Sequence, residues 1–388
     1  MKGLITKIDR LDMIKAAFEE LNIELRIVEC SQPLVGFDIP EVTFEHDQYK
    51  YLQLVQKILV DEKIDFCFST SGYDDLVILD SNLREYCNSI NIPFIGQSTE
   101  SSIICYDKWL TKAVLNYNNV PIVKSVLCNC EEELYKIIKA TDQPIICKRL
   151  KSWSGIGQLV IVPDQIQKDK LDSIEYPIIV EKFINAIEIS VNIFTHNDKH
   201  FCYPPVYKGD TSITSDHALN KLRICPYDWG EEQLNQIIST AVAAVEAVKS
   251  TGWAEVEMFL CDDKTLLVTE INARLCGTTR MISMATDVNP YSLSLRKVLS
   301  ISEFNNKIDA ISKVIEFPFY QNIPLINDDE IHVYYSKTPQ RYLGKVTAKV
   351  KGGSLSPRLR GLIEQGKCEC FIDDINNLCL KNSKKLIL

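Results

Sequence analysis

The stretch Gly252–Gly277, GWAEVEMFLCDDKTLLVTEINARLCG, contains two strand-like runs that flank the turn-like pair Asp262-Asp263. Two such runs around a short polar turn are typical of an antiparallel hairpin. Side chains alternate between the two faces of a strand. The hairpin therefore places its chemically active side chains on one face, namely Glu255, Glu257, Glu270, Asn272 and Arg274.

A two-residue loop at Asp262-Asp263 fixes the register that we expect for this hairpin. Glu255 then lies opposite Glu270, and Glu257 lies opposite Val268. In this register Glu257 and Glu270 are diagonal neighbours, with backbone positions about 7–8 Å apart.

Carboxylates crowded on one sheet face repel one another unless a cation neutralises them. Oxygen ligands from Glu257, Glu270 and Asn272 suit Mg²⁺, which also keeps waters and substrate phosphates as ligands. Arg274, two residues after the amide, could hold a phosphate or a developing anion with two hydrogen bonds. The alternative is a solvated strand face with ordinary salt bridges, and we favour the metal site.

A set of candidate phosphate ligands lies upstream of this hairpin. Lys148 ends the apolar run PIICK, and the loop that follows returns into the strand-like run LVIV. Glycine lets a loop backbone approach phosphate oxygens closely, although many ordinary hairpin loops also contain two glycines. The candidates are Lys108 in YDKWLTK, Lys148, and the loop residues Ser154, Gly155 and Gly157.

The segment YPIIVEKFINAIEISVNIF reads as two strands around a hinge at Glu181–Ile187. The hinge backbone at Lys182–Ile184 could hydrogen-bond a flat heterocycle, while apolar neighbours stack on it. Glu188 could accept hydrogen bonds from sugar hydroxyls. A plain connection between strands is the better explanation of this segment when it is taken alone.

The chain has 388 residues and a net charge of −9, which argues against nucleic acid as its main partner. The charge is uneven, because residues 331–388 carry +7 and the rest of the chain −16. Docking of this basic segment on the acidic remainder of the chain is favoured over an anion-binding role. The alternative role is to hold an anionic group of a substrate.

The sequence contains no pattern that is typical of a targeting segment or of a structural zinc site. The start MKGLITKIDR does not resemble a signal peptide, and no run approaches the ~18 apolar residues of a membrane helix. The 14 cysteines form no CxxC pair, so reduced thiols in the cytoplasm are expected. His196 and His200 have helical i,i+4 spacing, but Asn197-Asp198 between them favours a turn over a zinc-binding helix.

The order of elements predicts a mixed α/β and α+β chain. The first hundred residues alternate short apolar runs with helical patterns, which favours a parallel sheet covered by helices. Among them, Leu76–Ile90 is predicted as one helix. The later part is richer in strands, with a long helix at Glu232–Ser250 and a shorter one near Asp164–Leu171.

A series of segments, taken in chain order, resembles the ATP-grasp superfamily of ligases. The resemblance is strongest to its amino-acid and peptide-forming carboxylate–amine ligases. The segments are YDKWLTKAVLNYNNVPIVKS, PIICK, the Ser/Gly loop, IIVEKFINAIEISV, EMF and EINAR. The resemblance covers most of the chain. It implies an ATP-grasp fold with a Rossmann-like pre-ATP-grasp domain at residues 1–105. An ATP-binding and catalytic domain would follow at 106–310, with a lid subdomain at about 120–185, and a C-terminal subdomain at 311–388. Arg149 after the second lysine, and Trp153 and Ile156 in the loop, depart from the usual family pattern.

The resemblance also implies roles for the individual residues. Lys108, Lys148 and the loop from Ser152 to Gly157 would contact ATP phosphates. Glu181 and the backbone of Lys182, Phe183 and Ile184 would bind adenine, and Glu188 would bind the ribose. Mg²⁺, with Mn²⁺ as a substitute, would lie on Glu257, Glu270 and Asn272, and Arg274 would stabilise an acyl phosphate.

The implied reaction joins a small-molecule carboxylate to an amine through an acyl phosphate, with release of ADP and phosphate. We expect a polar lid at Val206–Arg223, whose Lys208, Lys221 and Arg223 could reach the γ-phosphate or a substrate carboxylate. Arg280 is a second candidate for that carboxylate. No pattern specifies a membrane contact or an interface, although homodimers occur in the superfamily. Two alternatives are a non-catalytic ATP-binding module, and a ligase that modifies a peptide or protein through its basic C-terminal segment.

Overall fold

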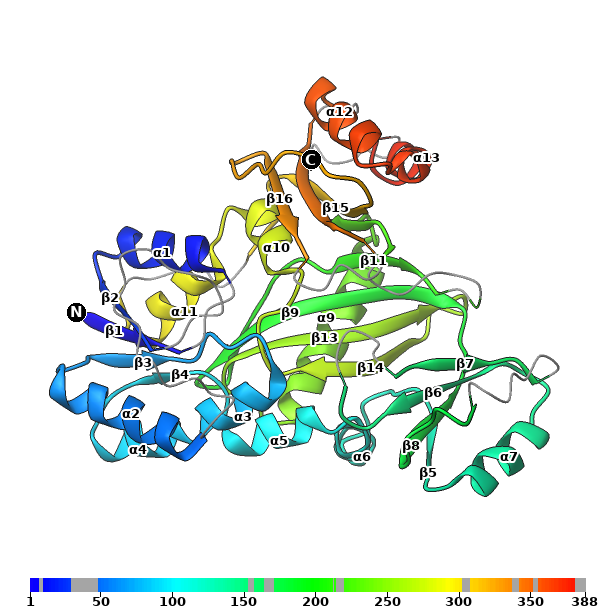
Figure 1. The fold of residues 1–388 in the computed structure, drawn as a ribbon, viewed down its shortest axis with the longest axis horizontal. Coiled ribbons are helices and arrows are strands. Elements are labelled where there is room, and N and C mark those ends of the chain that lie inside the picture. The colour runs from blue at the N-terminus through cyan, green and yellow to red at the C-terminus, as the bar shows by residue number, and fades with distance from the viewer. Residues whose placement is uncertain are drawn as a thin grey trace.

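The computed structural model describes residues 1–6, 10–28, 48–152, 157–163, 171–211, 213, 220–301, 308–336, 342–351 and 355–380. These residues form three β-sheets with helices packed around them. In Figure 1 the N-terminal sheet lies on the left, the largest sheet runs through the centre, and the third sheet lies at the lower right.

The N-terminal sheet is parallel, as the alternation of strands and helices predicts. Its order is β2-β1-β3-β4. Buried residues of α1 pack on one face and those of α2, α3 and α4 on the other. The bounds are β1 (Lys2–Ile5), α1 (Leu11–Glu20), β2 (Glu24–Ile27), α2 (Gln48–Asp61), β3 (Phe66–Phe68), α3 (Asp74–Ser81), α4 (Leu83–Ser89), β4 (Phe94–Ile95) and α5 (Thr99–Tyr106).

The prediction of a single helix at Leu76–Ile90 is wrong. The segment forms α3 and α4, which are separate helices that meet at Asn82. The apolar spacing continues across the break, because α3 and α4 contribute to the same buried cluster through Leu79 and Leu83. The apolar pattern alone therefore does not show that the helix is interrupted at Asn82.

The second sheet is antiparallel, with the order β5-β8-β6-β7. It spans residues 125–182, inside the segment predicted as a lid subdomain. Helix α7 packs on it through Leu134 and Ile138, which are buried with the strand residues Cys147 and Val180. The bounds are β5 (Ser125–Cys128), α7 (Glu131–Lys139), β6 (Ile145–Arg149), β7 (Leu159–Ile161) and β8 (Ile178–Lys182), with α6 (Lys108–Tyr117) before them.

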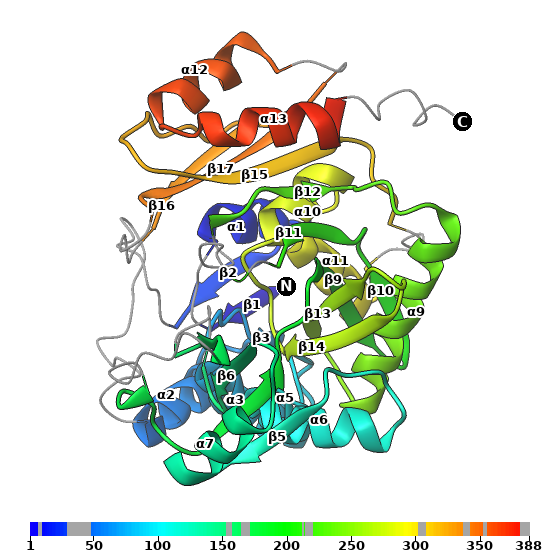
Figure 2. The same cartoon turned by 90° about the vertical axis from the view of Figure 1, so that its right-hand side faces the viewer.

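The largest sheet has nine strands in the order β14-β13-β9-β11-β12-β15-β17-β16, with β10 paired to β9. The C-terminal strands β15, β16 and β17 extend the same sheet as the central strands, and α12 and α13 cover them at the top of Figure 2. The bounds are β9 (Ala186–His196), β10 (Lys199–Cys202), β11 (Val206–Asp210), β12 (Arg223–Cys225), α9 (Glu231–Ala247), β13 (Trp253–Cys261), β14 (Leu266–Asn272), α10 (Thr279–Thr286), α11 (Pro290–Val298), β15 (Lys313–Phe319), β16 (Ile331–Tyr335), β17 (Gly344–Val350), α12 (Pro357–Gln365) and α13 (Ile372–Ile375).

The two faces of the nine-stranded sheet differ in character. Ile189, Val191 and Ile193 of β9 are fully buried in the same cluster as residues of α9. The alternating residues Ser190 and Asn192 point to the opposite face, because side chains alternate along a strand. We call this opposite face the polar face, and it carries the candidate site.

The predicted domain boundaries at residues 105 and 310 stay predictions. The predicted helix near Asp164–Leu171 lies mostly outside the described residues.

In the part of the chain that is described, no helix is both long and apolar enough to cross a membrane. The described cysteines are all free thiols.

Candidate active site

The hairpin that the sequence predicts at Gly252–Gly277 exists as β13 and β14, but its register differs from the prediction. Glu255 pairs with Asn272 and Glu257 with Glu270, whereas Met258 pairs with Val268. One extra residue in β14 forms a β-bulge between these two sets of pairs. Glu257 and Glu270 are therefore direct neighbours across the hairpin, and the predicted diagonal arrangement is wrong.

The loop explains part of the error. Cys261 N–H donates to Thr265 O and Lys264 N–H donates to Cys261 O, so the loop has three residues instead of two. Lys264 adopts a left-handed conformation with φ of 67°. A type I turn followed by a left-handed residue is a common three-residue hairpin loop.

The bulge keeps the apolar residues of β14 on one face of the strand and Glu270 and Asn272 on the other face. Leu266 and Val268 are buried against α9 before the bulge, and Ile271 and Ala273 are buried on that same side after it. A strand without a bulge would send every second residue to one face, which would turn Glu270 and Asn272 into the apolar core. The extra residue in β14 instead places these side chains on the polar face.

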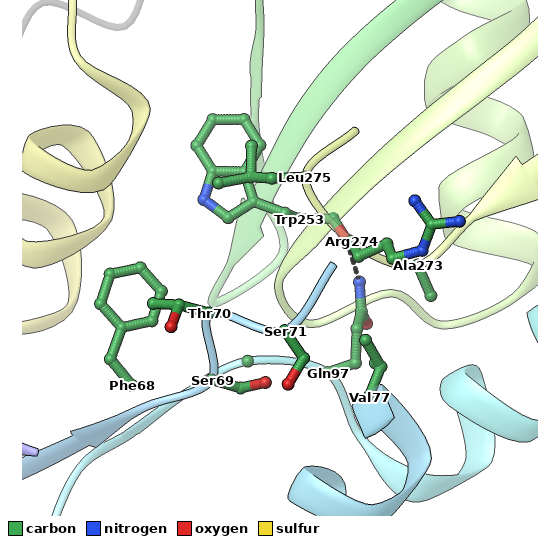
Figure 3. Close-up of a pocket in the computed structure, with 11 residues that line it drawn as sticks. Phe68, Ser69, Thr70, Ser71, Val77, Gln97, Trp253, Ala273, Arg274 and Leu275 are labelled. Carbon is green, nitrogen blue, oxygen red and sulfur yellow. Dashed lines mark hydrogen bonds between the residues drawn. The ribbon is translucent and has the colours of Figure 1, made fainter. Parts of the chain in front are cut away.

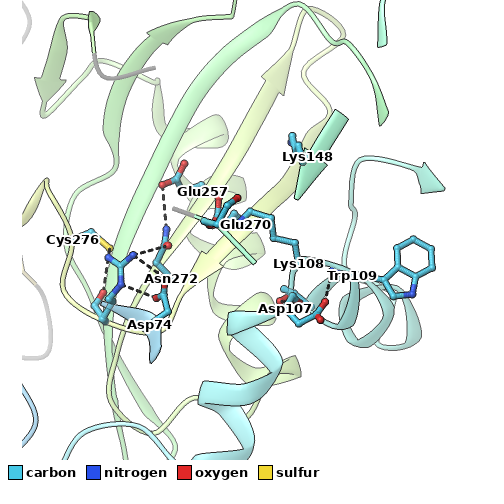
Figure 4. Close-up of polar contacts among 12 residues, drawn as sticks. Asp74, Asp107, Lys108, Trp109, Lys148, Glu257, Glu270, Asn272 and Cys276 are labelled. Atoms are coloured by element: carbon cyan, nitrogen blue, oxygen red, sulfur yellow. Dashed lines mark hydrogen bonds and ion pairs between the residues drawn. The ribbon is translucent and has the colours of Figure 1, made fainter. Parts of the chain in front are cut away.

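Lysines from two other elements neutralise the two hairpin carboxylates. Lys108 Nζ lies 2.9 Å from Glu270 Oε1 (Figure 4). Lys208 Nζ lies 2.9 Å from Glu257 Oε1. Asn272 Nδ2 donates to Glu257 Oε1 at 3.3 Å. The three predicted metal ligands and two of the predicted cations thus lie together on the polar face.

Glu257 lies near two other carboxylates as well as Lys208. Burial, and then the neighbouring carboxylates Glu255 and Glu270, raise the pKa of Glu257 although Lys208 opposes them. A carboxylate in such a position gains from a further cation. Two carboxylates and an amide oxygen are hard ligands that fit Mg²⁺ with its remaining waters, so the residues present fit the predicted metal.

A second charged cluster joins α6 to the antiparallel sheet. Glu181 Oε2 accepts from Lys148 Nζ at 2.7 Å, and Glu181 Oε1 lies 2.7 Å from Lys112 Nζ. Both oxygens of Glu181 are thus engaged by lysines, and this carboxylate orients Lys148. Sequence reasoning missed Lys112, although its i,i+4 spacing from Lys108 places both lysines on one face of a helix.

The hinge predicted to bind adenine connects β8 to β9, and its backbone has internal partners. Phe183 N–H donates to Pro144 O at 2.8 Å, and Ile184 O accepts from Thr211 Oγ1 at 2.7 Å. Lys182 belongs to the strand β8. Glu188, predicted to bind the ribose, lies 2.9 Å from Lys221 Nζ. The nucleotide contacts of these residues stay predictions.

The Ser/Gly loop is described only in part, because Ser154 and Gly155 lie outside the described residues. Gly157 has φ of 73°, and a Cβ on it would lie 2.6 Å from Arg149 Nε. A side chain at this position would be strained in conformation, and the Arg149 side chain would have to move to make room for it, so the local backbone favours glycine.

The segment Val206–Arg223, predicted as a polar lid, begins and ends in strands of the nine-stranded sheet. Lys208 lies in β11 and Arg223 in β12, and both are buried. Their charges therefore belong to the polar face itself. The middle of the segment, residues 212 and 214–219, lies outside the described residues.

Three charged side chains connect β12 to the C-terminal strands. Glu316 Oε1 lies 2.9 Å from both Arg223 Nη1 and Lys345 Nζ, and Thr347 Oγ1 donates to Glu316 Oε2. Burial, followed by the charge of Arg223, lowers the pKa of Lys345 to about 8. Lys345 belongs to the basic C-terminal segment that could bind a peptide or protein substrate, but its side chain is buried in this cluster. Glu316 was missed because no local motif marks it.

Arg274 and Arg280 occupy different environments. The guanidinium of Arg274 donates two hydrogen bonds to Asp74 and lies beside Asn272, to whose Oδ1 it donates at 3.4 Å. Arg280 Nη2 instead lies 2.6 Å from Asp12 Oδ2 of α1, a contact that holds α10 to the N-terminal sheet. The proposed substrate contact of Arg280 stays a prediction.

A further buried carboxylate, Glu255, lies beside the predicted metal ligands. Thr278 Oγ1 donates to Glu255 Oε1 at 2.7 Å and accepts from Asn192 Nδ2 at 2.9 Å. Although burial opposes its ionisation, the charge of Lys208 and the Thr278 hydrogen bond lower the pKa of Glu255 to about 2. This chain of hydrogen bonds fixes the loop after Arg274 to the polar face.

A small pocket lies where the N-terminal sheet meets the end of β14 (Figure 3). Ser69 and Ser71 line one side, and Trp253, Arg274 and Leu275 line the other. Its cavity volume of about 20 Å³ has room for about one water molecule. The pocket therefore marks a contact between two parts of the site and is too small for a substrate.

The zinc alternative at His196 and His200 is not supported by the geometry. Asn197 and Asp198 form the turn between β9 and β10, as predicted, with φ of 49° and 58°. His200 Nε2 lies 3.2 Å from Glu246 Oε1. Among the described residues, no group of three or more His, Cys, Asp or Glu side chains could hold a metal ion.

Comparison with known proteins identifies similar sequences and folds. Residues 113–286 match the family model of the ATP-grasp domain. The carbamoyl-phosphate synthase of Methanobrevibacter smithii is 23% identical over 316 residues, which cover 81% of this chain and 84% of that protein. D-alanine–D-alanine ligase B of Clostridium perfringens is 26% identical over 278 residues, which cover 68% of this chain and 88% of that protein.

The fold similarity extends over almost the whole chain. The crystal structure of the L-amino acid ligase from Bacillus licheniformis superposes with a TM-score of 0.74 at 17% sequence identity. This superposition covers 97% of this chain and 98% of that one.

Proposed function

Since this chain carries an ATP-grasp domain within an ATP-grasp fold, as its sequence motifs predict, we propose that it is an ADP-forming ligase that joins a carboxylate to an amine. One observation supports the proposal above all others. Glu257, Glu270 and Asn272 share one face of a sheet, and lysines from α6 and β11 converge on the two carboxylates.

The proposed nucleotide site lies between the antiparallel sheet and the polar face of the nine-stranded sheet (Figure 1). Lys148 projects from β6 and Lys108 from α6, so cations reach the region from two elements. Glu257, Glu270 and Asn272 would hold Mg²⁺, and the bound ion would supply positive charge against the phosphates. The lysines then no longer need to neutralise these carboxylates and can contact phosphate oxygens.

The chemical step needs a carboxylate with a good leaving group, because a free carboxylate does not react with an amine at neutral pH. Transfer of the γ-phosphoryl group of ATP to the carboxylate supplies that leaving group, and the amine then displaces phosphate. Cationic side chains fixed in advance stabilise the charge that develops. Arg274 would take this role, because its guanidinium lies beside the metal ligand Asn272.

We propose small-molecule substrates of amino-acid type. Two of the similar proteins are described as a D-alanine–D-alanine ligase and an L-amino acid ligase. The carbamoyl-phosphate synthase similarity leaves other small carboxylates open. A protein or peptide substrate bound by the basic C-terminal segment is less favoured, because Lys345 is buried against Glu316 and Lys351 is paired with Glu330.

A screen for phosphate and ADP release tests the proposal. Pairs of amino acids and small carboxylates are supplied with MgATP, and mass spectrometry identifies the amide product. The control is Glu270→Gln, which keeps the shape of the side chain but removes a charged metal ligand. We expect this variant to lose ligation and to bind MgATP at least tenfold more weakly.

Two results would contradict the proposal. Wild-type turnover by Glu270→Gln would show that the metal assignment is wrong. Tight binding of ATP without turnover of any pair would favour a non-catalytic ATP-binding module.

A further inference from the structure

The N-terminal domain reaches the proposed reaction centre through Asp74. Asp74 is the first residue of α3, and Arg274 follows the metal-ligand strand β14. Arg274 Nε donates to Asp74 Oδ1 at 2.7 Å, and Arg274 Nη2 donates to Asp74 Oδ2 at 3.1 Å (Figure 4). Only 12% of the Arg274 side chain and 17% of the Asp74 side chain are exposed. Two parallel hydrogen bonds in a mostly buried pair fix the plane of a guanidinium as well as its position.

The other contacts of Arg274 point its guanidinium toward the metal ligands. Nη2 also donates to Asn272 Oδ1 at 3.4 Å, and Nη1 donates to Cys276 Sγ at 3.1 Å. The contact to Asn272 is longer than either Asp74 bond, and the sulfur of Cys276 is a weaker acceptor than a carboxylate oxygen. Asp74 is thus the strongest partner that the structure gives to this side chain.

Helix α3 is itself held firmly to the N-terminal sheet. Asp80, in the same helix as Asp74, accepts hydrogen bonds from Thr6 at 2.6 Å and from Ser69 and Ser71 at 2.7 Å. Tyr51 donates to its second oxygen at 3.1 Å. These bonds join α3 to β1, to α2 and to the loop after β3. A rigid helix therefore presents Asp74 to Arg274, which is the arrangement that a precisely oriented side chain needs.

We propose that Asp74 is a positioning residue for Arg274. It fixes the guanidinium beside Asn272, where the anionic acyl phosphate and its adduct would form, so the N-terminal domain takes part in the chemical step. This inference rests on the ligase function proposed above. Without Asp74 the long arginine side chain regains rotamers, and ordering it again in each turnover costs free energy.

The first test compares Asp74→Asn, Asp74→Glu and the control Asp75→Asn. Asp75 is the exposed neighbour in the first turn of the same helix, and its Oδ1 contact to Leu76 N–H survives in an asparagine. We expect Asp74→Asn to lower kcat about 30-fold, because a small misplacement of a reacting group has effects of this order. The KM for ATP should stay within twofold, Asp74→Glu should recover part of kcat, and Asp75→Asn should match the wild type. An unchanged or raised kcat in Asp74→Asn would overturn the inference.

The second test asks whether Asp74 acts through Arg274. In an Arg274→Lys background, Asp74→Asn should lower kcat by no more than about twofold, because residues that act as one unit are not additive. A full further loss of about 30-fold in this background would mean that Asp74 acts independently of Arg274, which contradicts the inference.

A crystal structure of Asp74→Asn separates this inference from the proposed function. We expect the Arg274 guanidinium to leave its place beside Asn272, whereas the backbone of α3 and β14 stays unchanged. A guanidinium that remains in place overturns the inference even if the wild type proves to be a ligase. Absence of wild-type turnover with every substrate pair overturns the ligase function, and the structure of the variant still decides the role of Asp74.

Discussion

Each lysine of the candidate site is held by a carboxylate, and this pairing decides what a substitution should do. Lys148 shares Glu181 with Lys112, and the shared carboxylate is only 2% exposed. Although burial favours its neutral form, the two lysines lower the pKa of Glu181, so this carboxyl group stays ionised. Removal of one lysine leaves Glu181 with the other as its partner.

We therefore expect Lys148→Ala to damage nucleotide binding more than folding. The KM for ATP should rise at least tenfold, because a charge-assisted contact to a phosphate is lost. The melting temperature should fall only slightly, since Glu181 keeps Lys112. Steady-state kinetics and thermal unfolding check this, with the exposed Lys139→Ala of α7 as the control. An unchanged KM would remove Lys148 from the nucleotide site.

Glu316 also serves two buried cations, Arg223 and Lys345, and here the shared carboxylate itself is substituted. Glu316→Gln should destabilise the protein by about 3 kcal/mol at pH 7, since it leaves Arg223 and Lys345 buried without a counter-charge. Denaturant unfolding measures this difference, and Thr347→Val is a milder control that removes only the hydroxyl donor to Glu316.

The stability lost in Glu316→Gln should also depend on pH. Burial opposes the charge of Glu316, but Lys345 and Arg223 hold its pKa below the usual 4.5. A pKa lowered by folding adds stability above the unfolded value, and this stability is lost as the pH falls through the folded value. The difference between wild type and Glu316→Gln should therefore persist at pH 6 and shrink below about pH 4.5. A constant difference across this range would show that the charge is not its cause.

At the scale of elements, the β-bulge in β14 is the feature that makes the site. It keeps Val268 and Ile271 in the same core and moves Glu270 next to Glu257. The side chain of Lys264 in the hairpin loop takes no part in this arrangement, because it is exposed and lies at the far end of the strands from Asn272.

Because the loop lies far from Asn272, we expect that a substitution in it can raise the stability of the protein without loss of function. Lys264 has φ of 67°, a conformation that costs a non-glycine residue about 1 kcal/mol. Lys264→Gly should raise the free energy of unfolding by up to about 0.5–1 kcal/mol, because glycine adopts this conformation without strain. Chemical denaturation checks the gain, and MgATP affinity should remain unchanged. A loss of stability would mean that the lysine side chain stabilises the loop by contacts that outweigh the strain.

At the scale of the molecule, lysines from separate elements neutralise carboxylates that the metal would also need. Lys108 of α6 and Lys208 of β11 pair with Glu270 and Glu257. Mg²⁺ alone must compete with these internal cations. Mg²⁺ together with ATP supplies phosphate partners for the displaced lysines, so the two ligands should bind cooperatively.

Thermal unfolding tests this cooperativity. At a MgATP concentration of 100 Kd, the protein should gain about 2.7 kcal/mol of stability. Mg²⁺ alone, or ATP with a chelator, should each stabilise far less. Equal stabilisation by Mg²⁺ alone would show that the lysine pairs do not block the metal site.

The sequence by itself determined the parallel N-terminal sheet, the hairpin and the identity of the carboxylate and lysine candidates. These features depend on short-range patterns, namely apolar periodicity and motif spacing, which are visible along the chain. The sequence did not determine the register of β14, because a bulge depends on which residues the rest of the core accepts.

Only the tertiary structure decided which charges meet. Asp74 and Arg274 are 200 residues apart, and Arg223 and Glu316 are 93 apart. No local pattern marks Asp74 or Glu316, since their importance comes from the strands and helices that bring their partners close. Burial in the assembled sheets then strengthens these ion pairs and shifts the pKa values, and this effect has no counterpart in the extended chain.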